Sequence, residues 1–150
     1  MFDDLRDLYQ EVILDHGRRP RHGTRLAAFD ASAKGDNPMC GDRVQVFVRH
    51  GADGRIAQTG FEARGCAISI ASADLMAEVA AGRTDTDVRA LADAFRSMAR
   101  SGQAPDGDAA MERLRPLAGV HEYPSRVKCA TLAWHALLAA LDGKGVTSSE

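Results

Sequence analysis

The spacing of the apolar residues changes at Gly65 from the period of a strand to that of a helix, and this change limits the folds that the chain can adopt. From Arg43 to His50 apolar side chains fall at every second position, the period of a strand with one buried face. Beyond Gly65 they recur about every 3.6 positions, the period of a helix. Strands followed by helices are typical of the α+β class. We therefore expect a small antiparallel β-sheet of about three strands, packed against helices.

Three segments are expected to form the sheet. The strand at 43–50 is followed by a glycine-containing turn at 51–54, and a second strand at 55–64 completes an antiparallel hairpin. A third and weaker strand is expected at 26–34.

Five segments carry helical spacing. The first is amphipathic and must end near Gly17 and Pro20, because both residues break helices. Thr84 or Thr86 is expected to cap the third helix, and Ser125 the last. The last helix is apolar on almost every side and is therefore expected to lie in the core. The four later helices are predicted at 66–82, 84–101, 109–117 and 125–141.

The composition limits the classes of partner and the compartment. With 150 residues, of which 45% are hydrophobic, the chain is expected to form one domain over residues 1–150. Its 19 basic and 21 acidic residues nearly cancel, so no positive field favours nucleic acid. No run of about 18 apolar residues is present, and Asp3 and Asp4 stand where a secretory signal needs positive charge. We expect a cytoplasmic protein with no membrane or nucleic acid partner.

Three cysteines and one aspartate stand at the boundaries of the predicted elements. Cys40 and Asp42 flank Gly41 in a turn before the first clear strand, and a glycine there lets thiolate and carboxylate converge. Cys66 opens the first helix after the sheet, and Cys129 is expected in the first turn of the last helix. Helix N-termini lower thiol pKa values, which favours the thiolate that metals and sulfur electrophiles need.

These positions leave two interpretations open on the residues alone. A single cysteine in a reducing compartment is most often an inert, buried, small apolar residue. Three cysteines, one of them followed across a glycine by an acid, also fit one shared metal site. Structural disulfides are disfavoured, because the number of cysteines is odd and the cytosol is reducing.

Three motifs of the chain, in the same order, resemble the signature motifs of the IscU/NifU N-terminal family of iron–sulfur cluster assembly proteins. They are Asn37-Pro38-Met39-Cys40-Gly41-Asp42, Gly65-Cys66-Ala67-Ile68-Ser69 and Arg126-Val127-Lys128-Cys129-Ala130-Thr131-Leu132-Ala133-Trp134. The resemblance covers nearly the whole chain. It looks like the SufU branch, because IscU-type members carry a histidine immediately before the third cysteine, where this chain has Lys128. The stretch between Cys66 and Cys129 is also longer than in IscU-type members.

The resemblance implies a SufE/IscU-like fold and a zinc site made by Cys40, Asp42, Cys66 and Cys129. It also implies a zinc-dependent sulfurtransferase role in the SUF system, in which the chain accepts persulfide sulfur from a SufS-like cysteine desulfurase. The pyridoxal phosphate of that reaction would belong to the desulfurase. Downstream SUF cluster-assembly proteins are expected as further partners.

Within this site Cys40 is expected to be the sulfur acceptor. It lies in the flexible glycine turn, whereas Cys66 and Cys129 are anchored on helices. Three thiolates, one carboxylate and a Zn²⁺ ion carry a net negative charge, which is costly to bury without cations nearby. Arg126 and Lys128 are expected to supply them.

Two alternatives to the sulfur-transfer hypothesis stay open. Thiolates bind iron–sulfur clusters readily, so the same ligands suit a scaffold on which a cluster is assembled. A non-catalytic, zinc-stabilised interaction module is the third hypothesis. The cationic stretch at 16–23 is expected to be a solvated loop, with a docking patch for an acidic partner as its alternative. The histidines expected to be exposed are His16, His22, His50 and His121, and His135 is expected to be structural or at the surface.

Overall fold

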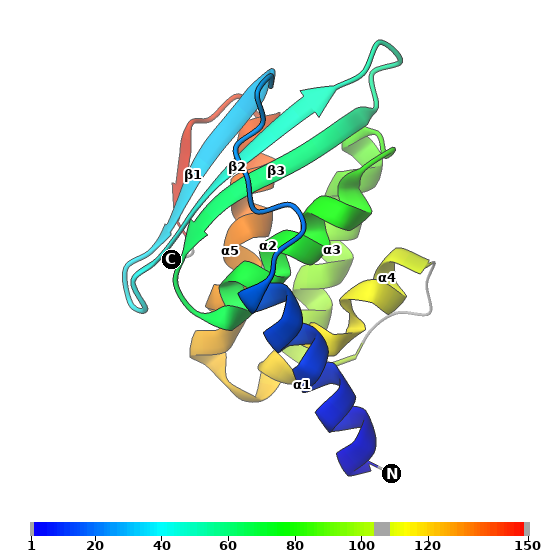
Figure 1. Ribbon diagram of the computed structural model, residues 1–150, viewed down its shortest axis with the longest axis vertical. Coiled ribbons are helices and arrows are strands. Elements are labelled where there is room, and N and C mark those ends of the chain that lie inside the picture. The colour runs from blue at the N-terminus through cyan, green and yellow to red at the C-terminus, as the bar shows by residue number, and fades with distance from the viewer. Residues whose placement is uncertain (1, 104–108, 149–150) are drawn as a thin grey trace.

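The computed structural model describes residues 2–103 and 109–148. This part of the chain forms four strands, five α-helices and one 3₁₀ helix (Figure 1). The strands are Ala31–Asn37 (β1), Asp42–His50 (β2), Ile56–Arg64 (β3) and Val146–Ser148 (β4). The helices are Phe2–Arg18 (α1), Ala67–Ala80 (α2), Asp85–Ser101 (α3), Ala109–Leu114 (α4), Arg115–Glu122 (η1) and Pro124–Leu141 (α5). The predicted α+β class is confirmed.

The four strands form one mixed sheet in the order β3-β2-β1-β4. β1 and β3 both pair antiparallel with β2, and β4 adds a parallel edge strand beside β1. The weak strand expected at 26–34 is β1, which begins later, at Ala31. The sheet thus has one strand more than expected. β4 is only three residues long, too short for a period of two to be recognised.

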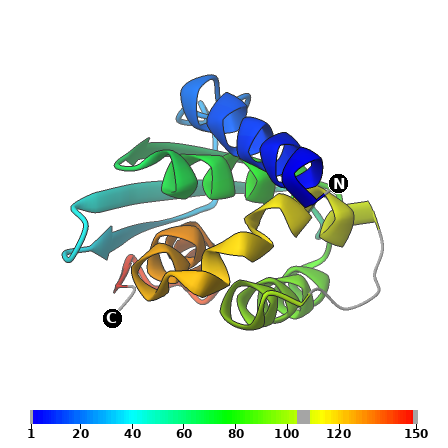
Figure 2. The same ribbon diagram turned by 90° about the horizontal axis from the view of Figure 1, so that it is seen from below.

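Helices cover one face of the sheet in two layers (Figure 2). α2 and α5 pack against the strands, α1 packs on α2, and α3 packs on α5. Phe95 of α3 stacks on Trp134 of α5 with their ring centroids 4.7 Å apart. α5 is buried along most of its length, as its apolar sequence predicts. None of the described helices combines the length and the apolar character needed to cross a membrane.

The opposite face of the sheet is covered by the segment between α1 and β1, which crosses the strands in Figure 1. Phe47 points to this face. The Phe29 ring lies 5.0 Å from the Phe47 ring, and the Arg25 guanidinium lies 5.1 Å from it. Gly60 lets the segment approach, since a Cβ there would lie 2.5 Å from the Thr24 oxygen. Phe47 is therefore fully buried although it lies opposite the core valines of β2.

One predicted helix cap is confirmed and another is wrong. Thr84 caps α3, and its hydroxyl accepts the Asp87 N–H at 3.1 Å. α5 begins at Pro124, ahead of the expected Ser125 cap, and no side chain caps it. Proline suits a first helical position, because it lacks the N–H that would be left unpaired there. Cys129 consequently lies in the second turn of α5 rather than the first.

The prediction that His16 is exposed is wrong. His16 lies near the end of α1 and is buried, with its Nδ1 2.5 Å from Asp74 Oδ2. The other carboxylate oxygen of Asp74 accepts the His22 N–H at 2.8 Å. These bonds fasten the first part of the cationic stretch to α2. Arg21, in the same stretch, is exposed and pairs with Asp15 at 2.6 Å.

His50 is only partly exposed, because both of its ring nitrogens face carboxylates. Nε2 lies 2.8 Å from Asp85 Oδ1, and Nδ1 lies 3.0 Å from Asp30 Oδ1. Asp85, and after it Asp30, raise the pKa of His50 above its ordinary value of 6.5. When protonated, the ring donates to both carboxylates and ties the end of β2 to the start of α3.

Replacing His50 with glutamine should destabilise the fold mainly at acid pH. A group whose pKa is raised on folding contributes stability that is fully present below its unfolded pKa and is lost as pH rises through its folded pKa. Because the pair is partly screened by solvent, we expect His50→Gln to lower the free energy of unfolding by about 1 kcal/mol near pH 5.5 and by much less near pH 9. Urea unfolding at both pH values measures the difference.

His121→Gln is the control for this comparison, since the His121 ring bonds the main-chain oxygen of Ala118 at 2.9 Å rather than a carboxylate. If His50→Gln lost the same stability at both pH values, the ionic contribution of His50 would be refuted.

Candidate metal centre

The β1–β2 turn presents Cys40 outward and Asp42 inward. The N–H groups of Cys40 and Gly41 donate to the main-chain oxygen of Asn37 at 3.3 and 2.9 Å, which closes the turn. Gly41 has a φ of +73°, a left-handed conformation that glycine adopts without strain. Cys40 is exposed, whereas Asp42, at the start of β2, is fully buried. The turn thus provides one accessible thiol and one buried carboxylate.

The Asp42 carboxylate joins three separate segments of the chain. Its Oδ1 accepts the Cys66 N–H at 3.0 Å, where β3 gives way to α2. The Asn37 side-chain amide lies 3.5 Å from Asp42 Oδ2 and 3.8 Å from the Cys129 sulfur. Together these contacts bring the β1–β2 turn, the start of α2 and the first half of α5 to one point of the molecule (Figure 1).

Gly65 makes room for this carboxylate and Cys66 starts the next helix. Gly65 has a φ of +147°, and a Cβ at this position would collide with Asp42 Oδ1. Cys66 is the N-cap of α2, as predicted, and its sulfur accepts the Ser69 N–H at 3.4 Å. A thiol at a helix N-terminus faces unpaired N–H groups, which favour a negative charge on the sulfur.

Cys129 has a different environment from the one that the sequence predicts. It is 1% exposed, and this burial raises the pKa of its thiol, with further increases from the neighbouring Asp42 and Cys66. The prediction of a lowered thiol pKa is therefore wrong for Cys129. The residue lies in the second turn of α5, beyond the unpaired N–H groups of the helix start. A cation beside the Cys129 thiol would favour its thiolate form.

Ligand atoms of Cys40, Asp42 and Cys129 lie within 4.8 Å of one another. Cys66 lies outside this set, but it is near enough to Cys129 to raise the pKa of that thiol. Three sulfurs and one carboxylate oxygen are a donor set that suits Zn²⁺ or an iron–sulfur cluster. The structure thus brings three of the four predicted ligands together and puts the fourth at their border. Their role as metal ligands stays a prediction.

The two predicted cationic neighbours lie at the start of α5. Arg126 is exposed and Lys128 is half-buried. Among the contacts of the described residues, neither side chain donates a hydrogen bond to the three cysteines or to Asp42. Compensation of the site's charge by Arg126 and Lys128 therefore stays a prediction.

Two residues that shape the site are not among the predicted site residues, namely Asn37 and Gly65. Asn37 is fully buried, and its Oδ1 has no hydrogen-bond partner among the described residues. Both stand inside the motifs that carry the family resemblance. A polar amide next to the turn and a glycine directly before a cysteine are the signals that could have identified them.

Comparisons with known proteins decide the family. The family model described as the NifU-like N terminal domain matches residues 8–141. The chain belongs to this family. It is 37% identical over 137 residues to the iron-sulfur cluster assembly scaffold protein IscU of Streptococcus pyogenes serotype M1, with 91% of this chain and 84% of the relative covered.

A second relative of this NifU-like chain is the zinc-dependent sulfurtransferase SufU of Bacillus subtilis (strain 168). The two are 35% identical over 150 residues, with 98% of this chain and 95% of the relative covered. Among solved structures, FiSufU from the thermophilic Fervidobacterium islandicum AW-1 superposes with a TM-score of 0.79 at 27% identity, covering 87% of this chain and 94% of that chain. The match to the NifU-like family therefore confirms the resemblance that the three motifs indicate. Relatives named IscU and SufU are similarly close, so the choice between their roles depends on the chemistry of the site.

Substituting Gly65 should disturb the site more than substituting another glycine of positive φ. In Gly65→Ala the added methyl group collides with the Asp42 carboxylate, so the Asp42–Cys66 hydrogen bond must break or shift. We expect a loss of about 1–3 kcal/mol of unfolding free energy beyond that of Gly54→Ala. Gly54 is the matched control, because it has a φ of +81° with nothing near its missing Cβ. Equal losses in urea unfolding would show that the Gly65–Asp42 approach is unimportant.

Proposed function

We propose that this chain is a zinc-dependent sulfur acceptor of iron–sulfur cluster assembly, with Cys40 as the acceptor. The observation that carries the proposal is the unequal exposure of the three thiols. Cys40 is exposed, Cys66 is half-buried and Cys129 is buried. A thiol that receives sulfur from another protein must be accessible, whereas thiols that hold a metal need not be.

The donor set supports zinc as the resident metal. Cys40, Asp42, Cys66 and Cys129 would hold it, and a Zn²⁺ ion would keep the thiols deprotonated without oxidising them. The environment of Cys129 fits this, because burial raises the pKa of its thiol and a nearby cation would offset that rise. Asp42 fits as well, since its fully buried carboxylate has no cationic partner among the described residues.

The transfer itself is an exchange between sulfur atoms. The Cys40 thiolate attacks the outer sulfur of a persulfide on the partner's cysteine. A new S–S bond forms on Cys40 as the partner's S–S bond breaks, and the partner's cysteine leaves as a thiolate. Sulfur moves without any net oxidation, so the step needs no added oxidant or reductant. The persulfide then resides on the exposed turn, where a downstream protein can take it.

The surroundings of Cys40 support the approach of a negatively charged persulfide. A surface hollow of about 470 Å³ adjoins the turn and is lined in part by Gly41, Arg43 and Arg64. Arg43 is largely exposed and lies 3.6 Å from Asp36, a weak pairing that leaves its charge available. A pyridoxal-phosphate cysteine desulfurase of the SufS type is the source of persulfide that we propose. Free thiols on all three cysteines suit a reducing compartment such as the cytoplasm.

A scaffold that assembles an iron–sulfur cluster on the same ligands is the second candidate. It is favoured by the 37% identity to the S. pyogenes relative named as a scaffold. Lys128 supports the zinc-dependent role instead, because a histidine at this position would offer a further metal ligand and lysine does not.

Cys40→Ala tests the acceptor role. We expect this variant to keep most of its zinc and to lose its stimulation of a cysteine desulfurase by about tenfold or more, because the remaining thiols are half-buried or buried. Cys129→Ala should instead lose zinc. Met39→Ala is the matched control, since Met39 is 74% exposed next to Cys40 and carries no thiol. Zinc content and desulfurase turnover are measured together. Full stimulation by Cys40→Ala would remove Cys40 as the acceptor.

Anaerobic reconstitution separates the two candidates. The protein is incubated with ferrous iron, sulfide and a thiol reductant, and its absorption spectrum is recorded. A sulfur acceptor that keeps its zinc should stay colourless, because Zn²⁺ has a filled d shell. A stable brown chromophore with displacement of zinc would favour the scaffold role instead.

A further inference from the structure

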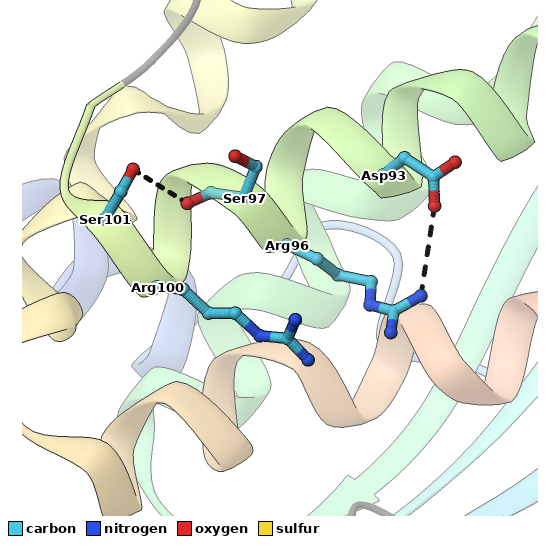
Figure 3. Close-up of a pocket in the computed structure, with 5 residues that line it drawn as sticks. All are labelled: Asp93, Arg96, Ser97, Arg100 and Ser101. Atoms are coloured by element: carbon cyan, nitrogen blue, oxygen red, sulfur yellow. Dashed lines mark hydrogen bonds and ion pairs between the residues drawn. The ribbon is translucent and has the colours of Figure 1, made fainter.

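A hollow of about 410 Å³ lies along the exposed side of α3 (Figure 3), and none of the three cysteines lines it. It is lined by Asp93, Arg96, Ser97, Arg100 and Ser101. Nothing in the proposed sulfur chemistry uses these residues.

Two guanidinium groups dominate this hollow. Arg96 and Arg100 are four residues apart on α3, and in Figure 3 both side chains extend to the same side, toward a neighbouring helix. His135 of α5 lies close to them. Its pKa is lowered by burial and then by the charges of Arg96 and Arg100. The neutral ring therefore avoids adding a third positive charge to the pair.

The positive charge of the pair is poorly compensated. Arg96 lies 3.9 Å from Asp93, whose side chain is 79% exposed, so this ion pair is weak. The Nε of Arg96 is buried without a hydrogen-bond partner among the described residues. No ion pair of Arg100 occurs among the described residues. Like charges four residues apart on a helix repel each other, and an anion between them would relieve the repulsion.

We propose that this hollow binds the phosphate group of a small molecule, held between Arg96 and Arg100. Two guanidinium forks match the charge and the oxygen geometry of a phosphate dianion, which both can bind through parallel N–H donors. Ser97 also lines the hollow, but in Figure 3 its hydroxyl points away from the two guanidinium groups, so the arginines alone would hold the anion.

The shape of the basic surface favours a small anion over an acidic protein. Its two arginines lie one helical turn apart, and the hollow is bounded by the carboxylate of Asp93 at one end. An acidic peptide would need a longer cationic track and would meet this carboxylate. A phosphate group needs only the two arginines.

Titration with inorganic phosphate and with glycerol phosphate, followed by NMR at constant ionic strength, tests the proposal. We expect saturable binding of at least one, and the tighter of the two tells whether the ligand is free phosphate or an organic phosphate. We expect Arg100→Gln to weaken phosphate binding by about tenfold or more, because it removes one charged hydrogen-bonding group. Arg100→Lys should recover only part of this, because lysine lacks the fork. Bound anion should also raise the pKa of the His135 ring. If the arginines had only a structural role, added phosphate would leave this pKa unchanged.

Arg49→Gln is the matched control. Arg49 is an exposed arginine of β2, and its replacement removes the same charge outside the hollow. The proposal is overturned if binding never saturates, if Arg49→Gln weakens it as much as Arg100→Gln does, or if the His135 pKa does not move. Binding of a glutamate-rich peptide without any binding of phosphate would also overturn it and would identify the surface as a protein-docking site.

Discussion

The buried carboxylate of Asp42 is the group on which the arrangement of the site depends. It lies at the start of β2, accepts the N–H at the start of α2 and lies beside the buried thiol of α5. A charged group without solvent is costly unless hydrogen bonds and opposite charge surround it. The Cys66 N–H and the Asn37 amide supply the hydrogen bonds, and a metal ion would supply the opposite charge. The Asp42 side chain therefore both joins three elements of the fold and serves as a proposed metal ligand.

Much of the fold follows from local patterns in the sequence. The alternation in β2, the Thr84 cap and the apolar surface of α5 each depend on residues a few positions apart, and each is observed. What the patterns miss depends on long-range contacts. The buried pair of His16 and Asp74 joins residues 58 positions apart, and no spacing reveals it. β4 is missed because three residues at an edge carry no period.

The same distinction applies to the site. The glycine turn at Cys40 and the helix start at Cys66 can be recognised from neighbouring residues, and the structure has both. The position of Cys129 beside them cannot be recognised in this way, because 92 positions separate Cys129 from Asn37, whose amide it contacts. The residues alone left a shared metal site for the three cysteines as one of two interpretations, and the family resemblance favoured it. The state of Cys129 was also mispredicted, since its burial is set by packing between α5 and the sheet rather than by its place in the sequence.

The central claim is that four residues from three distant segments surround one metal ion. X-ray absorption at the zinc edge of the zinc-loaded protein tests it most directly, because it counts the sulfur and oxygen neighbours of the metal. The account predicts three sulfur neighbours at about 2.3 Å and one oxygen neighbour at about 2.0–2.2 Å. A shell made of oxygen and nitrogen alone, or one with a single sulfur, would contradict it.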